Sequence, residues 1–188
     1  MSYTPVTHAL CVLLKCLILK GIKYTLLLSG NNNPPTSEKN IHNFWMQKAL
    51  EEAEKSLSKN EVPVGAVIIL DGEIIGKGHN QPILKKDPTS HAEIEAIRNA
   101  SVKIKNYRLN GADLYVTLEP CAMCFGAIVH SRISNIFFGA SDQKSGVCGS
   151  CENLSEKEYF NHRPQITGQI LANECSKILK DFFKEKRI

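Results

Sequence analysis

Two short motifs restrict this chain more than any other feature of its sequence. His91-Ala92-Glu93 stands thirty positions before Cys121, which directly follows Pro120 and forms a C-x-x-C pattern with Cys124. Zinc binds thiolate and imidazole groups tetrahedrally, and a catalytic zinc site uses three protein ligands and keeps a fourth position for water. We therefore predict that His91, Cys121 and Cys124 bind one Zn²⁺ ion per chain.

Glu93 is not needed to complete this ligand set. At a helix N-terminus its side chain can reach across the helix end beside the metal, so we expect Glu93 to be the catalytic proton shuttle. A C-x-x-C pair alone is also compatible with structural zinc or with a redox pair. A structural site would want a fourth Cys or His, and a redox pair has no use for an upstream H-x-E. The two motifs together favour catalytic zinc.

The hydrophobic pattern predicts an α/β fold. Apolar residues recur at helical spacing over 41–58, and a β-prone run over 64–70 is joined by the turn Asp71-Gly72 to a second strand over 73–78. Ser90 and Glu93 match a capping box and predict a helix over 90–100. Further segments are a strand over 112–118, a helix over 121–130, a strand over 133–139, a short acidic helix over 155–160 and a helix from about Leu171. This order, with two β-α-β crossovers, predicts a three-layer α-β-α sandwich around a mixed sheet.

Residues 1–40 are predicted to be an N-terminal extension and linker, followed by one domain over 41–188. Lys15, Lys20 and Lys23 interrupt the apolar run over 9–28, so no uncharged stretch reaches the about 20 residues of a membrane span. The run also lacks the charge order of a secretory signal. Three interpretations stay open, namely a translation-start artefact, a weak interfacial helix and an additional packing element. The Asn- and Pro-rich linker over 31–40 separates the run from the domain and favours the first.

Composition adds little to the motifs. The formal net charge is +4 over 188 residues, and most of the excess lies in residues 1–40, where four lysines face one acidic residue. The charge permits nucleic-acid binding but does not indicate it. The cysteines number seven, which is odd, and they need no disulfide framework. We therefore expect a reducing, cytoplasmic location.

Outside the zinc motifs, segments between about Phe44 and Arg187 resemble the bacterial tRNA-specific adenosine deaminases, which convert the wobble adenosine of an anticodon to inosine. The resemblance rests on Glu61-Val62-Pro63-Val64-Gly65, Gly78-His79-Asn80-Gln81-Pro82, Asp87-Pro88-Thr89, Asn106-Tyr107-Arg108-Leu109, Leu114–Pro120, His130-Ser131-Arg132-Ile133, Asn161-His162-Arg163 and Ile170–Cys175. It implies a cytidine-deaminase-like fold with a mixed five-stranded sheet. It also implies hydrolytic deamination, a tRNA anticodon stem-loop as substrate and a homodimer.

The same resemblance implies roles for further residues. Asn80 should hydrogen-bond the target nucleoside, Ala92 should offer backbone contacts, and the base pocket should be lined by Val62 and Leu118. Asp142 should contact a flanking nucleotide, and the stem-loop should be contacted by Lys144, Phe182, Phe183, Lys186 and Arg187. Structural roles stay open for Asn80 as a loop residue, for either phenylalanine as a core residue and for the terminal basic residues as a solvated helix end.

Two departures from the family pattern stand out. Ser141 occupies a position where the best-known relatives carry Arg, which predicts a weaker RNA contact. Cys148-Gly149-Ser150-Cys151 forms a second C-x-x-C, for which we expect two incidental thiols, with a second metal or redox site as the alternative. Two other functions also stay open for the chain, a deaminase of a free base or nucleotide such as guanine or dCMP, and a non-catalytic zinc-stabilised RNA-binding subunit.

Overall fold

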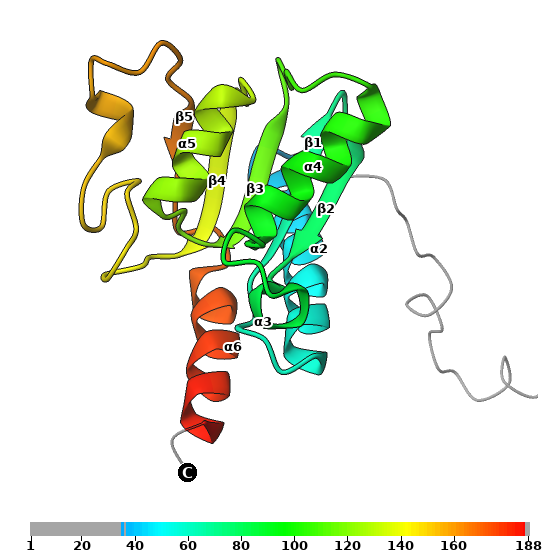
Figure 1. Ribbon diagram of the computed structural model, residues 1–188, viewed down its shortest axis with the longest axis vertical. Helices are drawn as coiled ribbons and strands as arrows, with labels where there is room; N and C mark the ends of the chain where they lie inside the picture. The colour runs from blue at the N-terminus through cyan, green and yellow to red at the C-terminus, as the bar shows by residue number, and fades with distance from the viewer. Residues whose placement is uncertain (1–34, 36, 187–188) are drawn as a thin grey trace, which may run out of the picture. The chain divides into compact units, whose positions relative to one another are not determined.

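The fold is built around a mixed β-sheet (Figure 1). The computed structural model describes residue 35 and residues 37–186, so the predicted extension over 1–40 lies almost wholly outside the described residues. Within them the sheet has five strands in the order β2-β1-β3-β4-β5. β1 (Gly65–Leu70) is antiparallel to β2 (Glu73–His79) and to β3 (Asp113–Leu118), whereas β4 (Asn135–Ala140) and β5 (Gln165–Thr167) run parallel to β3. The predicted mixed five-stranded sheet is confirmed.

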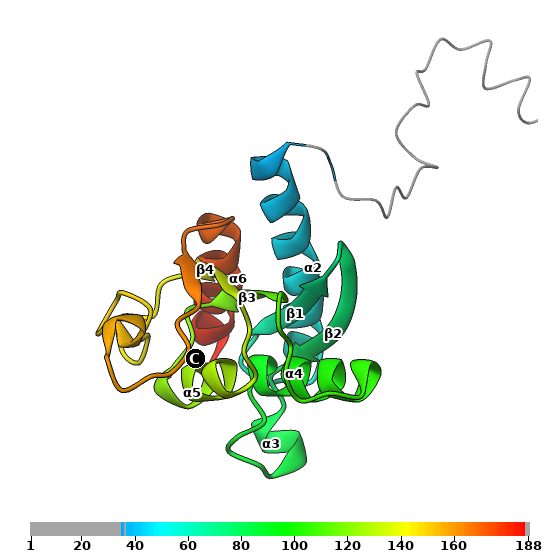
Figure 2. The ribbon, with the colours of Figure 1, turned by 90° about the horizontal axis from the view of Figure 1, so that it is seen from above.

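Helices cover both faces of this sheet, as the view in Figure 2 shows. α2 (Glu38–Ser58) and α6 (Ala172–Glu185) lie on one face, and α4 (Ala92–Ile104) and α5 (Ala122–His130) lie on the other. Strand residues alternate between the two cores, so that Val67 and Tyr115 pack towards α2 and α6, while Ile68 and Val116 pack towards α4 and α5. The predicted three-layer sandwich is confirmed.

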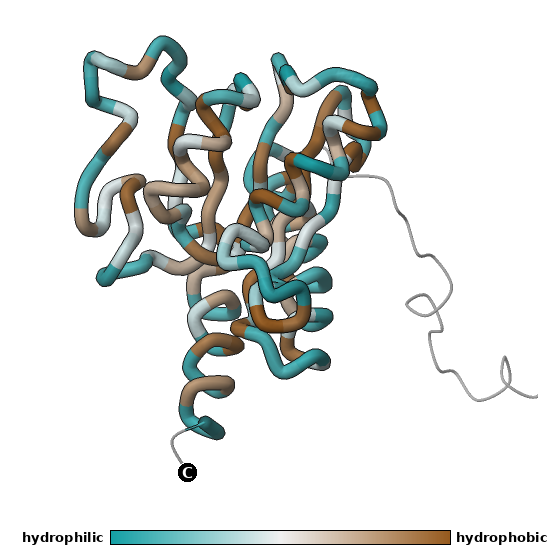
Figure 3. Tube along the Cα trace, in the orientation of Figure 1, coloured by the Kyte–Doolittle hydropathy of each residue, from teal (hydrophilic) through white to brown (hydrophobic). Residues whose placement is uncertain are grey.

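The last helix, α6, is amphipathic, and hydrophobic and hydrophilic residues alternate along its turns in Figure 3. It buries Cys175 in the core on this face of the sheet, buries Phe182 near its C-terminal end, and leaves its lysines exposed. Among the described residues, no helix combines the length and apolar character that crossing a membrane requires.

Several element boundaries differ from the prediction. The capping box is wrong, because α4 begins at Ala92 and the Ser90 hydroxyl donates to Glu95 Oε1 at 2.8 Å. The helix start is satisfied instead by Asn80 Oδ1, which accepts from the Ala92 N–H at 2.9 Å. A short helix, α3 (Pro82–Lys85), lies in the expected loop, and the expected acidic helix is a single 3₁₀ turn, η1 (Leu154–Glu156).

Gly78 allows α4 to lie directly on β2. A Cβ at this position would overlap the carbonyl oxygen of Ala92 and the amide nitrogen of Ala96. We predict that Gly78→Ala lowers the free energy of unfolding by about 2 kcal/mol, because helix backbone atoms cannot move aside as a flexible side chain can. Urea denaturation measures this change. Gly126→Ala in α5 is the matched control, since nothing lies within 4 Å of its added Cβ, and similar midpoints for both variants would contradict the prediction.

Candidate active site

Two helix N-termini bring the predicted metal ligands together. His91 is the N-cap residue of α4, Cys121 is the N-cap residue of α5, and Cys124 lies in the first turn of α5. His91 Nδ1 lies 3.8 Å from the Cys121 Sγ and 3.5 Å from the Cys124 Sγ. Usual Zn–N and Zn–S bonds at tetrahedral angles hold nitrogen and sulfur about 3.6 Å apart, so this donor set fits zinc. Within the described residues, these three form the one group of His, Cys or acidic side chains close enough to hold a metal.

The electrostatics of the three donors favour a thiolate at Cys121. Hydrogen bonds, first from Cys124 and then from His91, lower the pKa of the Cys121 thiol to about 4 although burial opposes this. The hydrogen bond to Cys121, followed by burial, raises the pKa of Cys124. The α5 N-terminus adds a favourable dipole for negative charge at both sulfurs. Metal binding requires both sulfurs as thiolates, which makes metal affinity depend on pH.

Glu93 lies in the first turn of α4, beside the three donors and only 4% exposed. Burial raises its pKa to about 7, and the neighbouring Cys121 acts in the same direction. A carboxyl group whose pKa lies near neutral pH can both accept and return a proton. The geometry therefore places a carboxyl group that could carry a proton beside the three possible metal ligands.

The residues predicted to hold the base lie in the core or pack against it. Asn80 is buried, and its side-chain oxygen is occupied by the Ala92 amide. That amide, predicted to contact substrate, is thus already paired. Val62 and Leu118 are partly buried and pack against the core beneath α4 and α5. The structural role foreseen as an alternative for Asn80 is therefore present, and its contact with the nucleoside stays a prediction.

The residues predicted to contact RNA have mixed surroundings. The Asp142 carboxylate accepts hydrogen bonds within its own loop, from the amides of Lys144 at 2.9 Å and Ser145 at 3.3 Å and from the Ser145 hydroxyl at 2.5 Å. Lys144 is exposed. Phe182 is buried beneath Lys186, whose Nζ lies 5.5 Å from the ring centroid, and Phe183 is 43% exposed. Arg187 lies outside the described residues.

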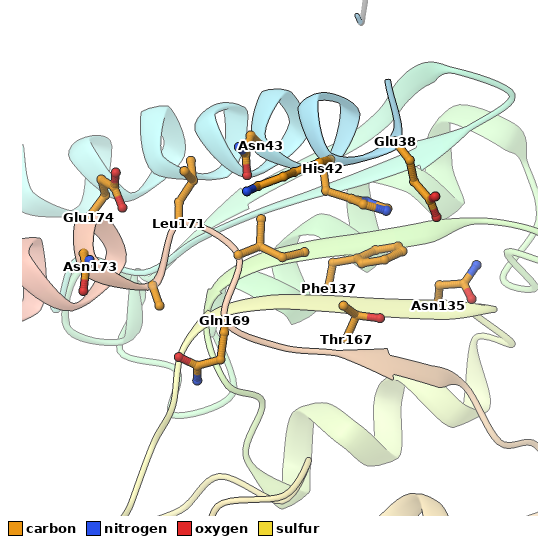
Figure 4. A pocket seen from close by; sticks show the side chains of 13 residues that line it. Glu38, His42, Asn43, Asn135, Phe137, Thr167, Gln169, Leu171, Asn173 and Glu174 are labelled. Atoms are coloured by element: carbon orange, nitrogen blue, oxygen red, sulfur yellow. The ribbon is translucent and has the colours of Figure 1, made fainter. Parts of the chain in front are cut away.

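A cavity of about 820 Å³ lies on the other face of the sheet, between α2, the start of α6 and the strands β4 and β5 (Figure 4). His42 and Phe137 line it, with ring centroids 4.3 Å apart, and Asn135, Thr167 and Gln169 are among its polar lining residues. It contains none of the metal donors. The size of this cavity therefore does not identify the candidate active site.

Comparisons with known proteins identify the family of this chain. A model of the MafB19-like deaminase family matches residues 40–187. The tRNA-specific adenosine deaminase of Haemophilus influenzae is 50% identical over 143 residues, which is 76% of this chain and 83% of that protein. The Bacillus subtilis protein of the same description is 44% identical over 144 residues, covering 77% of this chain and 89% of the relative.

Solved structures give the same result. The structure of a deaminase studied for A-to-I editing at the wobble position of transfer RNA is 41% identical, with a TM-score of 0.70, and the match covers 72% of this chain and 98% of that one. A guanine deaminase from Nitrosomonas europaea, 21% identical with a TM-score of 0.64 and covering 81% of this chain and 88% of its own, shares the fold. By sequence and by structure, this chain belongs to the tRNA-specific adenosine deaminase family.

Proposed function

We propose that this protein converts the wobble adenosine of a tRNA anticodon to inosine by hydrolytic deamination. The observation that carries the proposal is the convergence of His91, Cys121 and Cys124 beside the buried carboxyl group of Glu93. The relatives that are up to 50% identical bear names that specify the same reaction on tRNA. The site therefore supports a deaminase more strongly than a structural metal centre.

His91, Cys121 and Cys124 would hold the metal, and the fit of their separations supports Zn²⁺. When bound, zinc supplies a water acidic enough to attack at neutral pH. Deamination replaces the C6 amino group of adenine by oxygen from water. Glu93 would accept one proton of the water on a carboxylate oxygen and deliver it to N1 of adenine. It would then accept the second proton, from the hydroxyl group added at C6, and pass it to the amine that leaves as ammonia. The burial of Glu93 supports this role because it places the carboxyl pKa near 7.

Binding of the base is assigned to the groups around this centre. The described residues give the side-chain nitrogen of Asn80 no hydrogen-bond partner, so it is available to donate to the target nucleoside. Val62 and Leu118 would enclose a base that has been extruded from its stack. Phe183 is exposed enough to stack on an unpaired base, and Lys144, Lys186 and Arg187 would contact the phosphates of the stem-loop. Phe182 would support this surface from the core side.

Location and assembly form part of the same proposal. The five cysteines of the described residues are all free thiols, which supports a reducing cytoplasm. The family resemblance supports a homodimer. The domain proposed to carry the activity spans 41–188. Because α2 begins at Glu38, a chain starting at Ser37 would contain the whole of α2.

An assay of inosine formation tests the proposed function. We expect zinc-loaded protein, full-length or starting at Ser37, to deaminate a synthetic anticodon stem-loop with adenosine at the wobble position. Free adenosine, guanine and dCMP should react far more slowly, because they lack the flanking nucleotides and phosphates that hold the base in place. Preference for guanine or dCMP would favour the free-base alternative. Binding of the stem-loop without any turnover would favour the non-catalytic subunit.

A further inference from the structure

A buried carboxylate holds the loop that follows β4. Glu119 directly follows β3, two residues before the proposed ligand Cys121, and is 2% exposed. Its Oε1 accepts from the amides of Cys148 at 2.9 Å and Ser150 at 3.0 Å. Its Oε2 accepts from the amide of Asp142 at 3.0 Å and from the Ser150 hydroxyl. Each oxygen thus has two donors, which is the full capacity of a carboxylate.

Every one of these donors belongs to the segment 142–150, which we call the 142–150 loop. In the part of the chain that the structure describes, no Lys or Arg forms an ion pair with Glu119. The loop amides, and not a cation, therefore compensate the buried negative charge. An isosteric amide at this position would turn an N–H group towards N–H donors, so the arrangement requires a carboxylate.

The 142–150 loop packs tightly over this carboxylate. It also packs against the segment Pro120-Cys121, which we call the metal-ligand turn. A Cβ at Gly146 would lie 2.5 Å from the Glu119 carboxyl carbon and 2.6 Å from the Asp142 carbonyl oxygen, so only glycine fits. Gly146 also pairs with Cys121 in a single antiparallel β-bridge, and the Val147 amide donates to the Pro120 carbonyl at 3.0 Å. The loop is therefore fixed relative to a metal ligand at two places.

We propose that Glu119 is a positioning residue for RNA. It holds the 142–150 loop against the metal-ligand turn and thereby fixes the positions of Asp142 and Lys144 relative to the reacting base. The connection is direct, because the Asp142 amide bonds to Glu119 while the Asp142 carboxylate bonds to the amide of Lys144. This inference rests on the proposed function, since the RNA contacts of Asp142 and Lys144 are part of it.

The test compares zinc-loaded, full-length Glu119→Gln with Glu152→Gln as matched control. Glu152 lies just beyond the same loop, and its half-exposed side chain forms a surface ion pair with Lys157, which contributes little to stability. We expect Glu119→Gln to speed alkylation of the buried Cys148 and amide exchange across the loop by about tenfold, because several charge-assisted hydrogen bonds are lost. KM for the anticodon stem-loop should rise by a similar factor, with kcat and zinc per chain close to wild type.

Other outcomes would overturn the proposal. Unchanged alkylation and exchange would show that Glu119 does not hold the loop, and faster exchange with an unchanged KM would show that RNA does not use the loop. Loss of zinc, or a fall in kcat at constant KM, would place the effect at the metal centre. Should Glu119→Gln fail to fold, Ser150→Ala removes one of the four bonds and should shift the same quantities in the same direction. Alkylation and exchange need no RNA, so they test the loop even if the stem-loop is not the substrate.

Discussion

Glu93→Gln is expected to lower kcat for the anticodon stem-loop by at least about 10³-fold while zinc stays bound. The amide has nearly the same size as the carboxyl group and can occupy the same buried place, but it cannot accept and return a proton. The proposed mechanism uses Glu93 for more than one proton transfer. The loss of kcat should therefore lie towards the upper part of the about 10²–10⁴-fold range of general acid–base catalysis. Single-turnover inosine formation and metal analysis of the same sample measure both quantities.

Glu95→Gln provides the matched control for this prediction. Glu95 lies two positions further along α4 and is also buried. Its carboxylate accepts hydrogen bonds from Lys85, Ser90 and Arg98, whereas Glu93 lies beside the metal donors. Its replacement should lower the unfolding midpoint without a comparable fall in kcat. Wild-type turnover by zinc-loaded Glu93→Gln, or an equal loss of kcat in both variants, would contradict the role of Glu93.

The convergence of three possible metal ligands could be predicted from sequence because zinc chemistry restricts both residue type and spacing. His91, Cys121 and Cys124 are separated by up to 33 positions in the sequence. They can bind one metal only if the fold brings the N-termini of two helices together, and in the structure α4 and α5 meet in this way. Phe182 and Phe183 were predictable in part. Adjacent helix residues cannot both face one core, but only the structure shows that Phe182 is the buried one.

Local patterns failed where a distant residue supplied the partner. The capping-box pattern of Ser90 and Glu93 is local, but Asn80, twelve residues away from Ala92, satisfies the helix start. Glu119 looked like any other residue of a strand end, because its donors come from positions 23 to 31 residues later. The segments of α3 and β5, with four and three residues, are too short to show a period of their own.

Cys124→Ala is expected to prevent zinc binding and to abolish deamination. Cys124 is completely buried, and His91, Cys121 and Cys124 form the one group of three possible ligands among the described residues. Two remaining donors should hold zinc far more weakly than three, and a bound metal stabilises the folded state by mass action. A chelator should therefore lower the unfolding midpoint of wild-type protein and leave that of Cys124→Ala unchanged.

Cys175→Ala separates loss of the metal from loss of a buried thiol. Cys175 is as fully buried as Cys124, but it packs against Gly139 on the other face of the sheet. Its replacement should cost about 1 kcal/mol through the small cavity that it leaves, with zinc content, chelator response and turnover retained. A Cys124→Ala protein that keeps one zinc per chain and deaminates the stem-loop would remove Cys124 from the ligand set. The two thiols differ in location and not in burial. Equal chelator responses in the two variants would therefore show that the metal stabilises the fold without binding Cys124.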